Sequence, residues 1–207
     1  MGMALFWCAL LLPIVIASAA HAFASEREGR RWELLLSAPV SPFQVLRAKL
    51  IGRFIPADLL VILVPAIPLV AATAGVDAAR DLLLCVALVG AFLTTVFLIG
   101  IAASLASPTV RVAALWTIAL TAALALAGPI LESASGMGSR QNPETMPGLI
   151  GSLGSPYRIL RLLRKADPGA EVDRVLRLAR MYVGVHAALW AVLLAWMLAR
   201  FPKLARG

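Results

Sequence analysis

The chain has 207 residues, of which 61% are hydrophobic and 14% are charged, and its mean hydropathy is +0.89. Soluble domains normally carry roughly a quarter charged residues. This composition, gathered into long uncharged blocks, therefore excludes an ordinary soluble domain and places the chain among membrane proteins. The net charge of +8 does not indicate nucleic-acid binding, because the cations flank apolar blocks and few aromatic residues lie between them.

Five apolar segments are long enough to cross a bilayer. Only helices and closed barrels satisfy their backbone hydrogen bonds in lipid, and these continuous apolar runs lack the alternation of barrel strands. The sequence therefore predicts an all-α transmembrane helix bundle that forms a single domain over residues 1–207. The predicted spans are residues 3–22, 55–76, 82–106, 112–131 and 181–200.

The first apolar segment has a second interpretation, because residues 16–24 resemble the cleavage site of a signal peptide. The start of the chain, Met1 to Met3, lacks the positive charge that a signal peptide carries, whereas several cations follow the segment directly. Positive charge after the segment and none before it favours an uncleaved helix with its N-terminus outside and the next loop in the cytoplasm.

The predicted cytoplasmic loop, residues 24–53, contains six Lys or Arg residues and three Glu residues. Pro39 and Pro42 divide it into two short predicted helices, residues 26–37 and 41–49. Such a segment is typical of a helical loop that lies on the lipid surface.

Local signals define how these two helices begin. Ser25 is the predicted N-cap of the first helix, and Glu28, three residues later, completes a capping box. Pro42 stands in the first turn of the second helix, where its missing N–H costs nothing. In that second helix we expect Phe43, Val45 and Leu46 to face the membrane and Arg47 and Lys49 to face water, an expectation that rests on helical periodicity.

Residues 133–180 form a second predicted loop. Together with Glu132, it contains eight Lys or Arg residues and five Asp or Glu residues. The number of crossings places this loop outside, although its charge suits the cytoplasm. Its second half predicts two basic amphipathic helices, residues 157–165 and 171–180, which are joined by a turn at Asp167-Pro168-Gly169. We expect this amphipathic loop to lie at the lipid headgroups outside.

Sequence motifs for catalysis are missing from the chain. There is no G-x-x-x-x-G-K-[ST] phosphate loop, no G-x-S-x-G nucleophile motif and no H-E-x-x-H zinc motif. Cys8 and Cys85 lie inside apolar blocks and do not have the spacing of metal ligands. The sequence therefore predicts a protein that is not an enzyme and that binds no cofactor or metal itself.

The loop over residues 24–53 resembles the cytoplasmic motif of ABC-2 type transporter permeases. In that family the motif is close to E-R-E-x-G-T-x-E-L-L-L-x-x-P-[LV]-S-P, with a Lys a few residues later. The matching residues here are Glu26-Arg27-Glu28, Glu33-Leu34-Leu35-Leu36, Pro39-Val40-Ser41-Pro42 and Lys49. The chain differs at the Gly-Thr pair, where it has Arg30-Arg31.

This resemblance implies the permease subunit of an ATP-driven transporter, with export as the expected direction. It makes the loop a coupling helix that docks on a separate ATP-binding subunit, which holds ATP and Mg. It also implies a homodimer or a pair with a related permease, in the bacterial inner (cytoplasmic) membrane. The residues that it assigns to coupling are Glu26, Arg27, Glu28, Arg30, Arg31, Glu33, Leu34, Leu35, Leu36, Pro39, Ser41 and Lys49.

Two further expectations follow from the same resemblance. Family members usually have six spans, and the motif follows the second, so the chain is expected to lack the usual first span. A non-transporting assembly or scaffold subunit with the same fold is the alternative function. No predicted span carries a cluster of charges or aromatic residues that would define a substrate.

Overall fold

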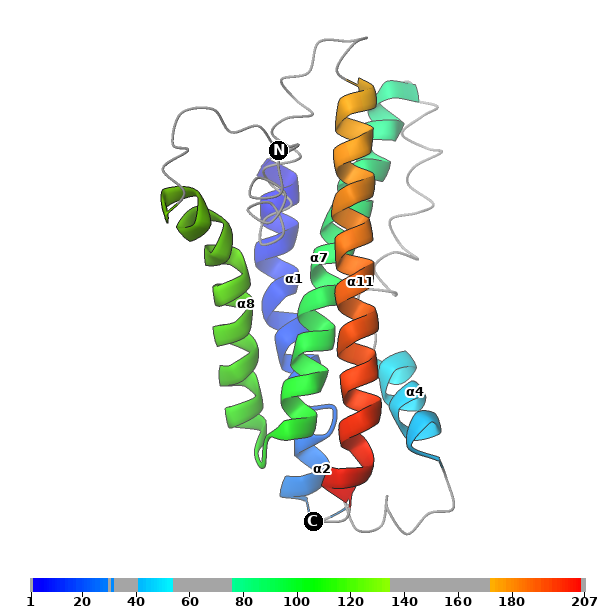
Figure 1. Cartoon of the computed structure of the whole chain (residues 1–207), viewed down its shortest axis with the longest axis vertical. Helices are drawn as coiled ribbons and strands as arrows, with labels where there is room; N and C mark the ends of the chain where they lie inside the picture. Colours follow the sequence, from blue (N-terminus) through cyan, green and yellow to red (C-terminus); the bar gives the residue numbers. More distant parts are fainter. Residues whose placement is uncertain (1, 30, 32–40, 54–75, 135–171, 206–207) are drawn as a thin grey trace.

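The structure, a computed structural model, describes residues 2–29, 31, 41–53, 76–134 and 172–205 (Figure 1). Within these ranges every regular element is a helix, as the sequence predicts. The helices are α1 (Gly2–Ala20), α2 (Ala24–Glu28), α4 (Pro42–Arg53), α7 (Val76–Ala106), α8 (Val110–Ala134) and α11 (Val172–Ala205).

Helix α7 is the centre of the bundle, because it packs against α1, α8 and α11 (Figure 1). Its buried side chains, among them Val96 and Phe97, form one core with Val15 of α1 and with Met197 and Phe201 of α11. Helix α1 also contacts α8, and α4 packs on α11. Helix α1 is therefore an integral part of the bundle.

The surface of α8 is more apolar than its buried side. Ala113, Thr117 and Thr121 are buried at successive fourth positions, which places them on one face of the helix. The exposed face carries large apolar side chains, among them Leu115 and Trp116, which are 67% and 57% exposed. Helices that pack in lipid use small and weakly polar residues at their contacts and leave apolar residues outside. A small, weakly polar buried face and a large, apolar exposed face are typical of a helix in a membrane protein.

Two stretches of the described helices are long and apolar enough to cross a bilayer, Leu82–Ala106 and Leu176–Phe201. Shorter apolar stretches cover Leu11–Ala20 and Val110–Leu126. These four stretches overlap four of the five predicted spans. The remaining predicted span, residues 55–76, lies almost entirely outside the described residues, so the number of spans stays a prediction.

The predicted separate helix over residues 171–180 is wrong, because α11 runs without a break from Val172 to Ala205. Its first turns belong to the bundle: Ala179 and Tyr182 are buried against Leu88 of α7. Leu178 and Ala179 of this amphipathic segment are therefore buried in protein and do not face headgroups. The other predicted amphipathic helix of this loop lies outside the described residues.

The predicted start of the first loop helix is also wrong. Helix α2 has five residues and ends at Glu28, and its N-cap is Phe23, which makes no side-chain capping bond. Ser25 lies inside α2, where its hydroxyl donates to the carbonyl oxygen of His21 at 2.6 Å. The predicted capping box does not form, because the first N–H groups of α2 have another acceptor, described below. The rest of the predicted helix, residues 32–37, lies outside the described part of the chain.

Helix α4 begins as predicted. Pro42 is its first residue, and the preceding Ser41 exchanges two capping hydrogen bonds with Gln44. The Ser41 N–H donates to Gln44 Oε1 at 2.8 Å, and the Gln44 N–H donates to Ser41 Oγ at 3.2 Å. This reciprocal arrangement satisfies backbone N–H groups that a helix start leaves without intrahelical partners.

The orientation of α4 differs from the prediction. Phe43 is 58% exposed, but Val45 and Leu46 are buried in the protein core and do not face the membrane. Arg47 is exposed as expected, whereas the side chain of Lys49 is mostly buried and pairs with Glu26 instead of facing water. The difference arises because α4 packs on α11, a contact that the local pattern of α4 does not contain.

Three parts of the chain meet at one end of the bundle (Figure 1). They are α2, the turn between α7 and α8, and the C-terminal end of α11. The rings of Phe23 and Phe201 pack edge to face with their centroids 6.0 Å apart, which joins α2 to the end of α11. Counting the predicted crossings from the cytoplasmic loop, residues 24–53, puts all three segments on the same side of the membrane, and their common position agrees with that count.

Candidate coupling site at the break between α1 and α2

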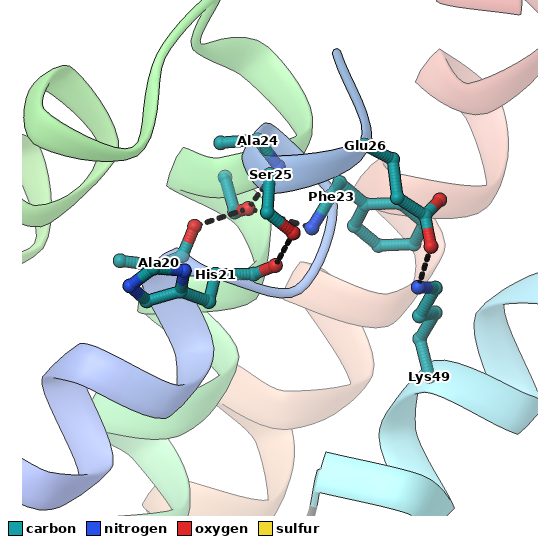
Figure 2. A network of polar contacts seen from close by, with 8 residues as sticks. Ala20, His21, Phe23, Ala24, Ser25, Glu26 and Lys49 are labelled. Atoms are coloured by element: carbon teal, nitrogen blue, oxygen red, sulfur yellow. Dashed lines mark hydrogen bonds and ion pairs between the residues drawn. The ribbon is translucent and has the colours of Figure 1, made fainter. Parts of the chain in front are cut away.

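The helical path breaks between Ala20 and Ala24, and one buried side chain of α7 closes the break. The Ser104 hydroxyl accepts the N–H groups of Phe23 and Ala24, each at 2.9 Å, and donates to the carbonyl oxygen of Ala20 at 2.8 Å (Figure 2). A helix end leaves such backbone groups without intrahelical partners. The Ser104 hydroxyl therefore supplies hydrogen-bond partners for backbone groups at the end of α1 and at the start of α2.

The close approach of α1 to α7 depends on a glycine one turn before Ser104. A Cβ atom added to Gly100 would lie 2.5 Å from the Cβ of Ala19 and 3.2 Å from Cγ2 of Thr117. Small residues permit such close backbone contact between helices in membranes. Gly100 thus allows Ser104 to reach the break.

The first charged residue of α2, Glu26, forms an ion pair with Lys49 of α4 (Figure 2). Both side chains are about four-fifths buried. The Lys49 ammonium also lies 5.9 Å from the centroid of the Phe23 ring, within the range of a cation–π interaction. The ion pair links α2 to α4, which is 23 residues away in the chain.

The second charged residue, Arg27, reaches the turn between α7 and α8. Its Nη1 donates to the carbonyl oxygen of Ser107 at 3.1 Å. Partial burial lowers the pKa of the Arg27 guanidinium from its ordinary value, but an arginine remains protonated in proteins. The result is a charge-assisted hydrogen bond, which is stronger than one between neutral groups.

The third charged residue, Glu28, caps α8. Its Oε1 accepts the N–H of Val110, the first residue of α8, at 3.0 Å. Thr109 Oγ1 accepts a second N–H, that of Val112, at 3.3 Å. A carboxylate at a helix N-terminus is favoured by the free N–H groups and by the helix dipole, by about 0.3–1 kcal/mol. The three consecutive charges of α2 thus bind three different places in the bundle.

The structure brings together only some of the predicted coupling residues. Glu26, Arg27, Glu28 and Lys49 form the contacts above, and Ser41 caps α4. Arg31 has an exposed side chain, and its N–H donates to the carbonyl oxygen of Glu26 at 2.8 Å. The residues that lie outside the described part of the chain are Arg30, Glu33, Leu34, Leu35, Leu36 and Pro39.

The sequence did not indicate the acceptor and donor groups of α7 and α8. Ser104 and Ser107 are small residues at the end of an apolar run, and nothing in the local pattern tells which backbone groups they meet. The resemblance implies that the charged residues of this loop dock on another subunit. In the structure Glu26, Arg27 and Glu28 have partners within the chain. These contacts perform no bond chemistry, but they join α2 mechanically to α4, α7 and α8.

Comparison with known proteins identifies the family. The sequence profile described as "ABC-2 family transporter protein" matches residues 3–200, which is nearly the whole chain. The chain therefore belongs to the ABC-2 transporter family, and the resemblance drawn from the loop motif is confirmed. The family makes it a membrane-transport component of the permease type. Neither a curated protein nor a solved structure gives a significant match.

Proposed function

We propose that this chain is the permease subunit of an ATP-driven exporter in the bacterial cytoplasmic membrane, which it crosses several times. A separate ATP-binding subunit, which holds ATP and Mg, docks on residues 24–53. Two copies of the chain, or one copy with a related permease, line the path. Family membership supports the permease role, and the three contacts of α2 with α4, α7 and α8 carry the proposal of coupling.

The geometry of α2 suits the transmission of movement. It is a five-residue helix, and a turn at residues 21–23 separates it from α1. Because this turn is not helical, α2 can change its angle to α1 without breaking an α-helix. A displacement of α2 either carries its partners along or breaks the Arg27 hydrogen bond, which contributes about 1.5–3 kcal/mol as a bond to a charged group.

The direction of transmission follows from the partners. Ser104 holds the start of α2 on α7, Arg27 holds the turn after α7, and Glu28 holds the start of α8. Closure of the ATP-binding subunits would therefore act on α7 and α8 through side contacts, and not only on α1 along the chain. The ion pair between Lys49 and Glu26 connects α4 to α2 as well.

The first test is co-purification of the tagged chain with the products of its neighbouring genes in mild detergent. We expect an ATP-binding subunit to be recovered and its ATP hydrolysis to rise in the complex. Arg31→Glu, at an exposed cation beside α2, should weaken this association, whereas Arg177→Glu, at an exposed cation near the start of α11, should not. Failure to recover any ATP-binding subunit would overturn the proposal. Recovery without any effect on hydrolysis would favour the scaffold alternative.

A further inference from the structure

An apolar groove lies between α8 and α11, and α7 forms its floor. Its volume is about 400 Å³, which is within the range of small-ligand sites. The lining includes Ala102, Ala103 and Ala106 of α7, Trp116 of α8, and Val192 and Trp196 of α11. The residues of the floor are small, the two indole rings at the sides are large, and the groove is open at the protein surface.

The groove reaches the end of the bundle that carries α2. Ala106 and Ser107, at the end of α7, belong to its lining. On α11 the exposed Arg200 follows Trp196 by four residues, so it lies on the same face about one turn, or roughly 6 Å, nearer that end. The exposed Arg111 stands near the start of α8 at the same end. An apolar groove is thus continuous with a cationic end.

The apolar lining and the nearby cation indicate which molecule could occupy the groove, a helix of a second copy or a lipid. A helix of a second copy packs with its axis about 8–10 Å from its neighbour, and close helix contacts in membranes favour small residues over large ones. Trp116 and Trp196 are large and more than one-third exposed at the mouth of the groove. An acyl chain matches the apolar lining, and an anionic headgroup matches the exposed Arg200 beside it.

We propose that this groove is a binding site for one anionic phospholipid. An acyl chain lies over the alanines of α7 between the two tryptophans, and the phosphate pairs with Arg200. Trp196 lies one turn from Arg200, and tryptophan is favoured at the headgroup level of a membrane. The site belongs to the outer surface of the bundle and does not depend on the proposed coupling role of α2.

Lipid binding to the whole chain tests the proposal. The chain is purified in detergent and titrated with phosphatidylglycerol or phosphatidylcholine, and bound lipids are counted by native mass spectrometry. We expect one tightly bound phosphatidylglycerol. Arg200→Gln should weaken its binding about fivefold, the effect of one cation near an anionic headgroup, and should weaken the binding of phosphatidylcholine, whose choline cation offsets the phosphate charge, by less. Arg180→Gln, at an exposed cation about 20 residues earlier on the same helix, is the matched control and should bind like the unchanged chain.

The apolar part of the site has its own pair of variants. Ala106→Phe fills the groove and should lower the binding of both lipids, whereas Ala119→Phe, at an exposed position of α8 outside the groove, should not. Equal lipid binding by the Arg200 and Arg180 variants would overturn the headgroup assignment. Loss of a dimer in Ala106→Phe with unchanged lipid binding would assign the groove to a second copy instead. Displacement of the lipid by glycerol phosphate would identify a free phosphate site and would also overturn the proposal.

Discussion

The hydroxyl of Ser104 on α7 accepts the backbone N–H of Phe23 at the start of α2, and 81 residues separate the two in the sequence. The same oxygen holds Ala24 and the end of α1. Ser104→Ala should therefore leave three backbone groups without their partner in a buried place. An unsatisfied buried group costs about 1–3 kcal/mol, so we expect the free energy of unfolding in detergent to fall by at least this amount.

The matched control for Ser104→Ala is Ser25→Ala. Ser25 makes one local hydrogen bond at an exposed place, and its loss should change stability by less than about 0.5 kcal/mol. Amide hydrogen exchange separates a local effect from a global one. Exchange at Phe23 and Ala24 should accelerate in the Ser104 variant more than exchange in the middle of α7. Unchanged exchange at these two amides would contradict the role of Ser104.

The ion pair between Glu26 and Lys49 can be tested by exchanging its charges. Glu26→Lys and Lys49→Glu should each destabilise the chain, because each places two like charges together in a mostly buried location. The double exchange should recover about 1 kcal/mol or more relative to the sum of the single changes. The measurement is a double-mutant cycle of unfolding free energies. Strict additivity would show that the pair does not interact.

Two glycines in helices should respond to alanine in opposite directions. Gly100→Ala places a methyl group 2.5 Å from the Cβ of Ala19, so backbone must shift, and we expect a loss of about 1–3 kcal/mol. Gly184→Ala meets nothing within 4 Å and should gain up to about 1 kcal/mol from helix propensity. Thermal unfolding in the same detergent compares the two variants. Equal effects would contradict the close approach of α1 to α7.

Replacement of Glu28 tests the cap on α8. Glu28→Gln keeps an oxygen acceptor for the Val110 N–H but removes the charge, so the expected loss is about 0.3–1 kcal/mol. Glu28→Lys reverses the charge at the helix N-terminus and should cost more. Both effects should shrink in high salt because Glu28 is exposed. A loss in Glu28→Gln that is independent of salt would contradict the electrostatic explanation.

Local patterns predicted the elements well wherever the determinants lie close together in the chain. The apolar blocks predicted the helices of the bundle, and Pro42 predicted the start of α4. The same reasoning failed where a distant element decides the outcome. Val45 and Leu46 are buried because α4 packs on α11, and Tyr182 is buried because α11 continues onto α7.

In the candidate site, too, the sequence predicted residues that a local motif contains but not their distant partners. The motif led to Glu26, Arg27, Glu28 and Lys49 from the sequence, but their partners were not evident. Arg27 and Ser107 are 80 residues apart, and Glu28 and Val110 are 82 residues apart. Neither a helical nor a strand period relates positions so distant, so only the packing of α1 and α8 on α7 brings these groups together.

The central claim is that α2 transmits nucleotide-driven movement to the corner between α7 and α8. Amide hydrogen exchange of residues 104–112 tests it most directly, in the complex with the ATP-binding subunit, with and without a non-hydrolysable ATP analogue. We predict that the nucleotide changes exchange in this region of the unchanged complex, and that Arg27→Gln removes the change while the subunit stays bound. A nucleotide effect confined to residues 24–53, or one that persists fully in Arg27→Gln, would contradict the claim.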